Sequence, residues 1–328
     1  MTPLKLGIIG AGAIAQQHLS ILQALEDVKA VGITSRTAAK AQDLAGRFGI
    51  TGVYNCIEDL VTQARPDALM VLVSVDQVEA VVRQLLPFRL PMFIEKPAGL
   101  SAQANLGLLE AARRYGVGIM VGLNRRFYSV FHQGIDIIRQ HGPLMGVCVQ
   151  GHERIWRQHQ RTDDHFKNIV LPHWVFANSI HTIDLLRFFG GEIAHLTTIT
   201  HRYSEPLGDQ FAALMEFAGG AIGQYSAFWH SPGGWAVTLY GKGVTVMFEP
   251  LEQGRWVDEQ FQSHPLEPDQ ADQEFKPGFY KQAIAFRNFV VSGRLDWPAQ
   301  DLQGSYQSMQ IARQMTKDIS QRSLTNSQ

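Results

Sequence analysis

The stretch that decides the fold lies at the N-terminus, where residues 4–15 read LKLGIIGAGAIA. Its first six residues form a short apolar run, which predicts a buried strand over Leu4–Ile9. Glycines then predict a tight turn, and apolar residues at helical spacing predict a helix over Ile14–Leu25. Such a strand, turn and helix present free backbone N–H groups at the start of the helix. These groups predict a binding site for phosphate.

The spacing within this turn is G-x-G-x-x-A, which is typical of dinucleotide-binding turns when it joins a strand to a helix. Gly10 permits the tight turn, Gly12 lets the backbone approach a diphosphate, and Ala15 lets helix and strand pack closely. Ala13 and Ile14 open the helix and are expected to contact the cofactor as well. The alternative is a glycine turn that binds no ligand.

Apolar strands and helices alternate over the first part of the chain, and this alternation predicts a doubly wound parallel sheet. Further strands are expected at residues 28–34, 68–75, 92–95 and 117–121, with helices at 37–48, 77–86 and 101–115. We therefore expect a Rossmann-type dinucleotide-binding domain over residues 1–123.

The pattern changes near Asn124, where longer strands with alternating polar and apolar residues begin. They are expected at residues 146–155, 193–203, 211–217, 220–230, 235–241 and 243–248, with helices at 130–141, 180–189, 280–291 and 302–320. This predicts an α+β substrate-binding and oligomerisation domain over residues 124–328, with a large, mostly antiparallel open sheet. Its last helix can pack back on the first domain. The fold class is α/β.

The end of the second strand reads Thr34-Ser35-Arg36, without the Asp or Glu that usually accepts a hydrogen bond from the ribose of NAD. Ser35 and Arg36 can instead hold a 2′-phosphate, since a guanidinium makes charge-assisted hydrogen bonds to phosphate. NADP is therefore preferred over NAD as the expected cofactor. The alternative is an Arg36 side chain that is only solvated.

Composition excludes several other classes of protein. The 328 residues carry a net charge of −1, which indicates neither a nucleic-acid partner nor a membrane surface. Cys56 and Cys148 form no CxxC pair, and the histidines are scattered, so neither a disulfide framework nor a metal site is expected. With no leader-like or membrane-spanning segment, the expected compartment is the cytoplasm.

Three further segments carry a family resemblance: Glu95-Lys96-Pro97, Asn124-Arg125-Arg126-Phe127, and Ile180–Asp184 followed by Gly190-Gly191. Together with the glycine turn, they resemble the Gfo/Idh/MocA oxidoreductases, a family that includes glucose-fructose oxidoreductase and inositol dehydrogenase. The resemblance spans essentially the whole chain. It implies NAD(P)(H)-dependent hydride transfer between nicotinamide and a carbinol or carbonyl carbon of a sugar, inositol or related hydroxy compound.

The resemblance also implies roles for particular residues. Lys96 is placed beside the nicotinamide and the reacting carbon, where an ammonium stabilises charge developing on the substrate oxygen. His181 matches a histidine that binds a substrate hydroxyl or acts as acid or base. Ser74, Glu95 and Asn124 are expected at the cofactor.

One departure bears on mechanism. The dehydrogenases of this family usually carry Asp four residues before the histidine, and here that position is Ala177. Asn178 is adjacent but cannot act as a base at neutral pH. Two alternatives follow. The chain is a dinucleotide-binding sensor or regulator without turnover, or it is a reductase or lyase of the same fold that acts on a non-sugar substrate.

Donors and aromatic rings are concentrated between residues 152 and 174. We expect Trp156, Arg157 and His173 at an anionic or hydroxyl-rich substrate, together with Asn178. The alternative is a solvated connection between strands. The resemblance implies that Arg126 and His181 bind the substrate as well. Since a bare apolar sheet aggregates, the second domain is expected to pack in a homodimer or homotetramer.

Overall fold

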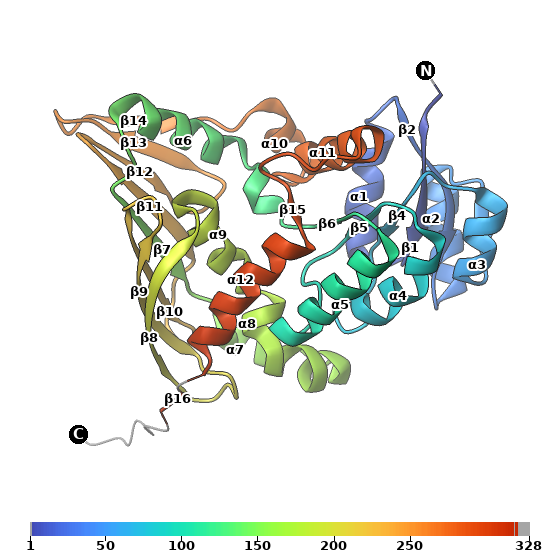
Figure 1. The fold of residues 1–328 in the computed structure, drawn as a ribbon, viewed down its shortest axis with the longest axis horizontal. Helices are drawn as coiled ribbons and strands as arrows, with labels where there is room; N and C mark the ends of the chain where they lie inside the picture. Colours follow the sequence, from blue (N-terminus) through green and yellow to red (C-terminus); the bar gives the residue numbers. More distant parts are fainter. Residues whose placement is uncertain (1, 318, 321–328) are drawn as a thin grey trace. The chain divides into compact units, whose positions relative to one another are not determined.

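The chain divides into two compact units in a computed structural model that describes residues 2–317 and the backbone of residues 319 and 320 (Figure 1). The first unit takes the chain up to Asn124 and then Glu274–Tyr306. The second takes Arg125–Gln273 and the chain from Gln307 onward. The division at residue 123 expected from the sequence lies next to the first crossing, but it assigned residues 274–306 to the second domain.

Within the described residues, the first unit holds a seven-stranded sheet in the order β15-β6-β5-β4-β1-β2-β3. All neighbours pair in parallel except β15 with β6. The strand order changes direction beside β1, which is where open α/β sheets bind ligands. The strands are β1 (Leu4–Ile9), β2 (Val28–Thr34), β3 (Gly52–Tyr54), β4 (Ala68–Val71), β5 (Met92–Ile94), β6 (Ile119–Val121) and β15 (Gln300–Asp301).

Helices cover both faces of this sheet. Met92 and Ile94 of β5 pack in one cluster with residues of α4 and α5, whereas Phe93 between them contacts His18 of α1 and Phe286 of α11. Burial on both faces explains why these strands are continuous apolar runs. The helices are α1 (Ala13–Gln23), α2 (Ala38–Phe48), α3 (Ile57–Asp59), α4 (Val78–Leu85), α5 (Ala102–Tyr115) and α11 (Phe279–Ser292).

Local sequence sets the ends of these helices. The Ser101 hydroxyl accepts a hydrogen bond from the Ala104 N–H at 3.1 Å and so caps α5. Gly49 and Gly116 end α2 and α5 in the left-handed conformation.

The late segment 274–306 joins the first unit through two contacts. Phe279 and Ala283 of α11 pack against Ile21 of α1, and β15 pairs with the edge strand β6. The pairing satisfies an edge that would otherwise be open. The first unit is therefore built from two separate stretches of sequence.

The second unit holds a nine-stranded sheet, counted over the described residues, in the order β14-β13-β12-β11-β7-β10-β9-β8-β16. Only β10–β7 and β16–β8 pair in parallel, so the sheet is mostly antiparallel and open. The strands are β7 (Gly146–Gly151), β8 (Ile193–His201), β9 (Gln210–Phe217), β10 (Ile222–Phe228), β11 (Trp235–Gly241), β12 (Val244–Phe248), β13 (Gly254–Val257), β14 (Ser263–Leu266) and β16 (Ile319–Ser320).

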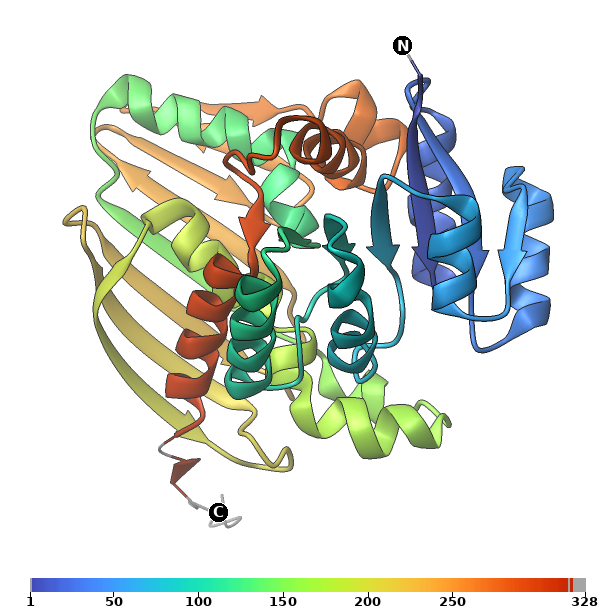
Figure 2. The same ribbon diagram turned by 45° about the vertical axis from the view of Figure 1, so that its right-hand side comes forward.

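Helices lie on one face of this second sheet, as Figure 2 shows for α6 (Ser129–His141) and α9 (Ile180–Gly190). Phe131 of α6 and Phe189 of α9 both contact Phe248 of β12. Residues on the strands accordingly alternate between buried and exposed. The shorter helices of this unit are α7 (Ile155–His159), α8 (Trp174–Ala177) and α10 (Gln270–Glu274), and α12 (Leu302–Met315) enters it from the first unit.

The structure confirms the expected fold class and corrects several element bounds. The last helix ends at Met315 instead of residue 320, because residues 319–320 pair with β8 as β16. The strand expected over 146–155 ends at Gly151, since Arg154 is left-handed and Ile155 begins α7. Short strands β3, β13 and β14 were not predicted, because three or four residues carry too little periodicity.

Candidate functional site

The glycine turn of the first unit has the geometry that a dinucleotide needs. Gly10 has a φ of +110°, and a Cβ there would lie 2.3 Å from the Leu72 carbonyl oxygen, so only glycine fits. A Cβ on Gly12 would meet no described atom within 4 Å, and Gly12 itself is the N-cap of α1. The N-terminus of α1 is therefore uncrowded, and its first N–H groups suit a diphosphate.

The end of β2 lies beside this turn, since the Gly10 N–H donates to the Thr34 carbonyl at 2.8 Å. The Ser35 hydroxyl accepts from the Thr37 N–H at 3.3 Å and so helps to open α2. Arg36 is exposed. Ala13 and Ile14 form the first residues of α1, exposed and half-buried respectively.

Glu95 and Lys96 follow β5 at the same carboxyl edge of the parallel sheet. Glu95 is 8% exposed, and its Oε1 lies 2.7 Å from His18 Nε2 on α1. His18 in turn contacts the rings of Phe93 and Phe279, each with centroids 5.0 Å apart. Glu95 therefore ties the end of β5 to α1. Lys96, the next residue, is half-buried.

Ser74 and Asn124 complete the residues expected in the first unit. Ser74 is exposed, and its carbonyl accepts from the Gln77 N–H at 2.8 Å, which forms the turn after β4. Asn124 is 2% exposed, and its Nδ2 donates to the Pro277 carbonyl at 3.0 Å. Asn124 thus joins the two stretches of sequence that build the first unit.

His181 of the second unit lies in the first turn of α9 and is 3% exposed. Its Nε2 is 2.8 Å from Arg125 Nη1. Trp235 contacts both groups, with the Arg125 guanidinium 5.1 Å from its ring and the imidazole centroid 5.9 Å away. A guanidinium only donates, so Nε2 is the acceptor and a neutral ring carries its proton on Nδ1.

Glu153 binds the segment that precedes His181. Its carboxylate accepts hydrogen bonds from Trp174 Nε1 at 2.9 Å, Asn178 Nδ2 at 2.7 Å and Ser179 Oγ at 2.6 Å. The side chain follows β7 and is 7% exposed. This carboxylate therefore connects a central strand to α8 and to the start of α9.

Arg126 is held by a buried ion pair. Its Nε and Nη2 lie 2.6 and 2.9 Å from the two oxygens of Asp184, and the Ser308 hydroxyl donates to the same carboxylate at 2.7 Å. Both charged side chains are at most 3% exposed. The pair ties the start of the second unit to α9, and it occupies the guanidinium that the sequence assigned to substrate.

A pocket of about 560 Å³ opens in the second unit. Its surface mixes polar and apolar groups, including the carboxylates of three glutamates and the rings of His152 and Trp235. Its described lining is His152, Glu153, Arg154, Gln158, Asn178, Gly233, Gly234, Trp235, Glu249, Pro250, Leu251 and Glu252. Of the substrate residues expected from the sequence, Asn178 lines it, whereas Trp156 and Arg157 lie on α7 outside that lining. His173 is also outside it, with its Nδ1 3.0 Å from the Ile169 carbonyl oxygen.

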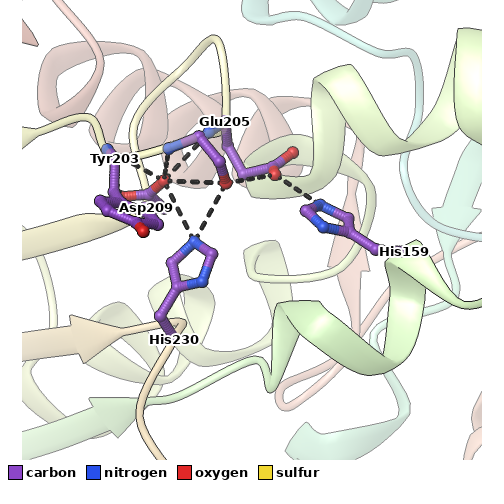
Figure 3. Close-up of polar contacts among 6 residues, drawn as sticks. His159, Tyr203, Glu205, Asp209 and His230 are labelled. Atoms are coloured by element: carbon purple, nitrogen blue, oxygen red, sulfur yellow. Dashed lines mark hydrogen bonds and ion pairs between the residues drawn. The ribbon is translucent and has the colours of Figure 1, made fainter.

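A second polar cluster surrounds the β8–β9 connection, and Figure 3 shows its side chains converging. The buried Asp209 carboxylate accepts from the N–H groups of Tyr203, Ser204 and Glu205. Glu205, 6% exposed, has its Oε1 2.7 Å from His159 Nε2 at the end of α7. The cluster anchors α7 and lies outside the described lining of the pocket.

Two buried tyrosines of this unit, Tyr128 and Tyr225, have a pKa above the ordinary value of a phenol. Burial is the main cause that raises the pKa of Tyr128, and Glu252, to which it donates at 3.2 Å, adds to the effect. Burial likewise raises the pKa of Tyr225, whose hydroxyl lies 3.3 Å from that of Thr182. Both phenols therefore stay protonated at neutral pH.

Neither a metal site nor a membrane span is found in the part of the chain that the structure describes. No group of three or more His, Cys, Asp or Glu side chains is arranged there to hold a metal ion. Nor does any helix in that part combine the length and hydrophobicity needed to cross a bilayer.

Family models match sequence in both units. The NAD-binding Rossmann-fold model of the Gfo/Idh/MocA oxidoreductase family matches residues 4–123, and that family's C-terminal domain model matches residues 149–247. An inositol 2-dehydrogenase from Burkholderia lata is 26% identical over 228 residues, which cover 66% of this chain. The match spans 65% of that relative, slightly less than two thirds of its length.

Solved structures share the fold over nearly the whole chain. A dehydrogenase from Chromobacterium violaceum has a TM-score of 0.83 at 17% identity, covering 96% of this chain and 94% of its own. An oxidoreductase from Agrobacterium radiobacter, solved with NAD⁺, L-tartaric acid and magnesium, has a TM-score of 0.78 at 15% identity, covering 95% of each chain. At such low identity these likenesses concern the fold alone.

Proposed function

The chain belongs to the Gfo/Idh/MocA oxidoreductase family, and on that premise we propose that it is an NAD(P)(H)-dependent dehydrogenase of a sugar, inositol or related hydroxy compound. The observation that carries the proposal is the uncrowded N-terminus of α1 at Gly12, at the same sheet edge as Lys96. A parallel sheet binds its ligand at this carboxyl edge.

The first unit would hold the dinucleotide. Gly10, Gly12, Ala13 and Ile14 would bind the diphosphate with backbone N–H groups, which the space beside Gly12 allows. Ser74, Glu95 and Asn124 would contact the rest of the cofactor. When bound, the nicotinamide supplies the acceptor or donor of hydride.

Lys96 and His181 are the proposed catalytic residues. The Lys96 ammonium would donate a hydrogen bond to the reacting oxygen of the substrate and stabilise negative charge there. His181 would assist by moving a proton to or from a substrate hydroxyl. Asn178, which lines the pocket, would bind a hydroxyl, and Arg126, Trp156, Arg157 and His173 stay predicted substrate residues.

For the cofactor we propose NADP(H) in preference to NAD(H). Arg36 is exposed directly after β2, where it can meet a 2′-phosphate, and Ser35 precedes it. The family model itself is described as NAD-binding, and it does not separate the two cofactors.

The substrate proposal rests on relatives and on the pocket. The inositol 2-dehydrogenase relative acts on a polyol. The pocket of the second unit offers carboxylates and a Trp235 ring, which suit hydroxyl groups and the apolar face of a sugar. Ala177 favours one second candidate, a dinucleotide-binding sensor without turnover, because the usual carboxylate is missing there.

The test is to measure the reduction of NADP⁺ and NAD⁺ by absorbance with a panel of inositols, aldoses and polyols. We expect turnover with a hydroxy compound and a loss of at least ~10²-fold in Lys96→Ala, with little change in cofactor affinity. Full activity in Lys96→Ala would refute the role of Lys96. Tight cofactor binding with no turnover on any substrate would support the sensor.

We also propose a homodimer or homotetramer in the cytoplasm. Ile199, Leu214, Ile222 and Tyr240, one from each of four strands, are 45–66% exposed on the sheet face opposite α6 and α9. A second copy would cover this apolar face. Light scattering should give a multiple of the 36.6 kDa chain mass, and Leu214→Glu should give the single chain. Cys56 and Cys148 are free thiols, which suits a reducing compartment.

A further inference from the structure

The backbone segment that precedes His181 is bound by the carboxylate of Glu153, which lies more than 20 residues earlier in the sequence. Trp174, Asn178 and Ser179 all donate to Glu153, so that two hydrogen bonds reach Oε2 and one reaches Oε1. These donors come from α8 and from the two residues between α8 and α9. Since His181 follows Ser179 by two residues, the orientation of this segment determines the position of the His181 backbone and hence of its imidazole.

Strand β7, which ends two residues before Glu153, also packs closely on α9. A Cβ at Gly151 would lie 2.3 Å from the Tyr225 hydroxyl and 2.9 Å from Thr182 Oγ1. The end of β7 can therefore approach α9 this closely only because residue 151 is glycine. Thr182, the neighbour of His181, donates back to the Ser179 carbonyl at 2.9 Å. The segment is therefore held from the strand end as well as through the Glu153 carboxylate.

Position 177 offers no polar side-chain atom, because it is an alanine that is 4% exposed. Glu153 is an acidic residue that this segment contacts, and it also lines the pocket. The imidazole that follows is engaged by Arg125 in one tautomer.

We propose that Glu153 is a positioning residue for His181, holding the segment 174–179 so that the imidazole keeps one orientation and one tautomer. The inference rests on the proposed function, because it assigns Glu153 a part in the reaction of that same site. Glu153 acts through the segment, and the carboxylate itself transfers no proton.

The sharpest variant is Glu153→Gln, which keeps the shape of the side chain but puts an NH₂ group where a carboxylate oxygen accepts. An NH₂ group at Oε2 faces the Trp174 and Asn178 donors, whereas one at Oε1 forces the Ser179 hydroxyl to turn from donor to acceptor. In either case the charge-assisted hydrogen bonds to the carboxylate are lost. Glu153→Asp keeps both oxygens on a shorter stem and should restore part of the effect. Ser179→Ala removes only the bond to Oε1 and serves if Glu153→Gln does not fold.

Glu205→Gln is the matched control. Glu205 is 6% exposed, against 7% for Glu153, and it lies in the same unit but contacts His159 instead of the segment before His181. It should therefore cost stability in a similar way and leave His181 unchanged. His159 should respond in this variant alone.

The direct measurement is nitrogen NMR of the full chain with labelled histidines, with His181→Gln used to assign the signal. We expect one neutral tautomer with an unprotonated Nε2 in the unaltered protein and in Glu205→Gln. Glu153→Gln and Ser179→Ala should mix tautomers or broaden the signal. A His181 signal that is unchanged in folded Glu153→Gln, or equally disturbed in Glu205→Gln, would overturn the proposal.

Kinetics supply the second measurement. We expect Glu153→Gln to lower kcat by up to about 100-fold, because a displaced catalytic group loses its alignment, with an unchanged KM for the dinucleotide and an altered pH profile of kcat. Glu153→Asp should recover part of the loss. If the unaltered protein turns over no substrate, the proposed function fails, while the NMR result still decides whether Glu153 positions His181.

Discussion

The dinucleotide end of the first unit and the pocket of the second unit are assembled in different ways. In the first, Gly10, Gly12 and Lys96 lie at the ends of strands that share one sheet edge, and each is placed by its own short stretch of backbone. In the second, the pocket takes residues from four separate stretches between His152 and Glu252. The first region depends on local conformation, whereas the second depends on contacts between distant parts of the chain.

The two regions also differ in which groups carry them. The first region is characterised by backbone N–H groups and by the open space where a Cβ of Gly12 would lie. The first region also has one such group in Glu95, but several buried carboxylates hold the second together, where Asp184 binds Arg126 and Glu153 binds the segment before His181. A buried carboxylate is costly when its partners are lost. Substitutions of single side chains should therefore damage the second region more than the first.

The largest expected effect is that of Asp184→Asn. Both members of the Arg126–Asp184 pair are at most 3% exposed, so the variant removes the negative charge that faces a buried guanidinium. Breaking such a pair costs about 3–5 kcal/mol. The free energy of unfolding from denaturant titration should fall accordingly.

The control for Asp184→Asn is Asp43→Asn in the first unit. Asp43 pairs with Arg47 at 3.3 Å, but these side chains are 62% and 50% exposed. An exposed pair of this kind contributes under about 1 kcal/mol. Equal losses in the two variants would contradict the contrast between the regions.

The next effect separates two glycines of the first region. Gly10→Ala places a Cβ against the Leu72 carbonyl at a φ of +110°, which should cost roughly 1–3 kcal/mol or more in stability. Gly12→Ala places its Cβ where no described atom lies within 4 Å, so Tm should stay unchanged. The methyl group should instead weaken dinucleotide binding, which calorimetry measures.

A reversed outcome for the glycine pair would contradict a binding role for the turn. If Gly12→Ala lowered Tm and left dinucleotide affinity intact, the space beside Gly12 would not be a binding surface. The local geometry of the turn would then serve only the fold.

The sequence predicts the first region well because its signals are short in range. Strands β1 and β2 lie where expected, since burial on both faces makes each a continuous apolar run. The ends of strands and helices in the second unit are less predictable. Arg154 in a left-handed conformation ends the strand expected to reach residue 155, and the last helix gives way to β16 after Met315.

The sequence could not identify His18, Arg125 and Glu153 as members of the site. His18 meets Glu95 across 77 positions, Arg125 meets His181 across 56, and Glu153 meets Asn178 across 25. No spacing rule links residues so far apart. A local signal does exist at His18, a polar residue on the apolar face of α1 beside Ala15 and Leu22, both of which are buried.

A smaller effect is expected for Arg36→Ala at the first region. Its guanidinium is exposed, so a charge-assisted contact to a 2′-phosphate would be partly screened by water. Affinity for NADPH should fall about 10-fold, which corresponds to ~1.4 kcal/mol, while affinity for NADH changes little. Titration of both cofactors measures this, with Arg47→Ala as the control for an exposed arginine of α2. Equal losses for NADPH and NADH would remove the preference for NADP.

The smallest effect is expected for Asp258→Asn, which tests whether burial determines how much a carboxylate of the second unit contributes to stability. A hydrogen bond from His264 at 2.8 Å is the main cause that lowers the pKa of Asp258, and the Gln262 N–H adds to it. A carboxyl whose pKa is lower in the folded chain stabilises the fold above its unfolded value near 4, and the gain disappears as the pH falls through the folded pKa. The variant should therefore lower Tm slightly at pH 7, and the difference should vanish in acid. Because the Asp258 side chain is 19% exposed, against 2% for Asp184, a loss as large as that of Asp184→Asn would show that burial does not separate them.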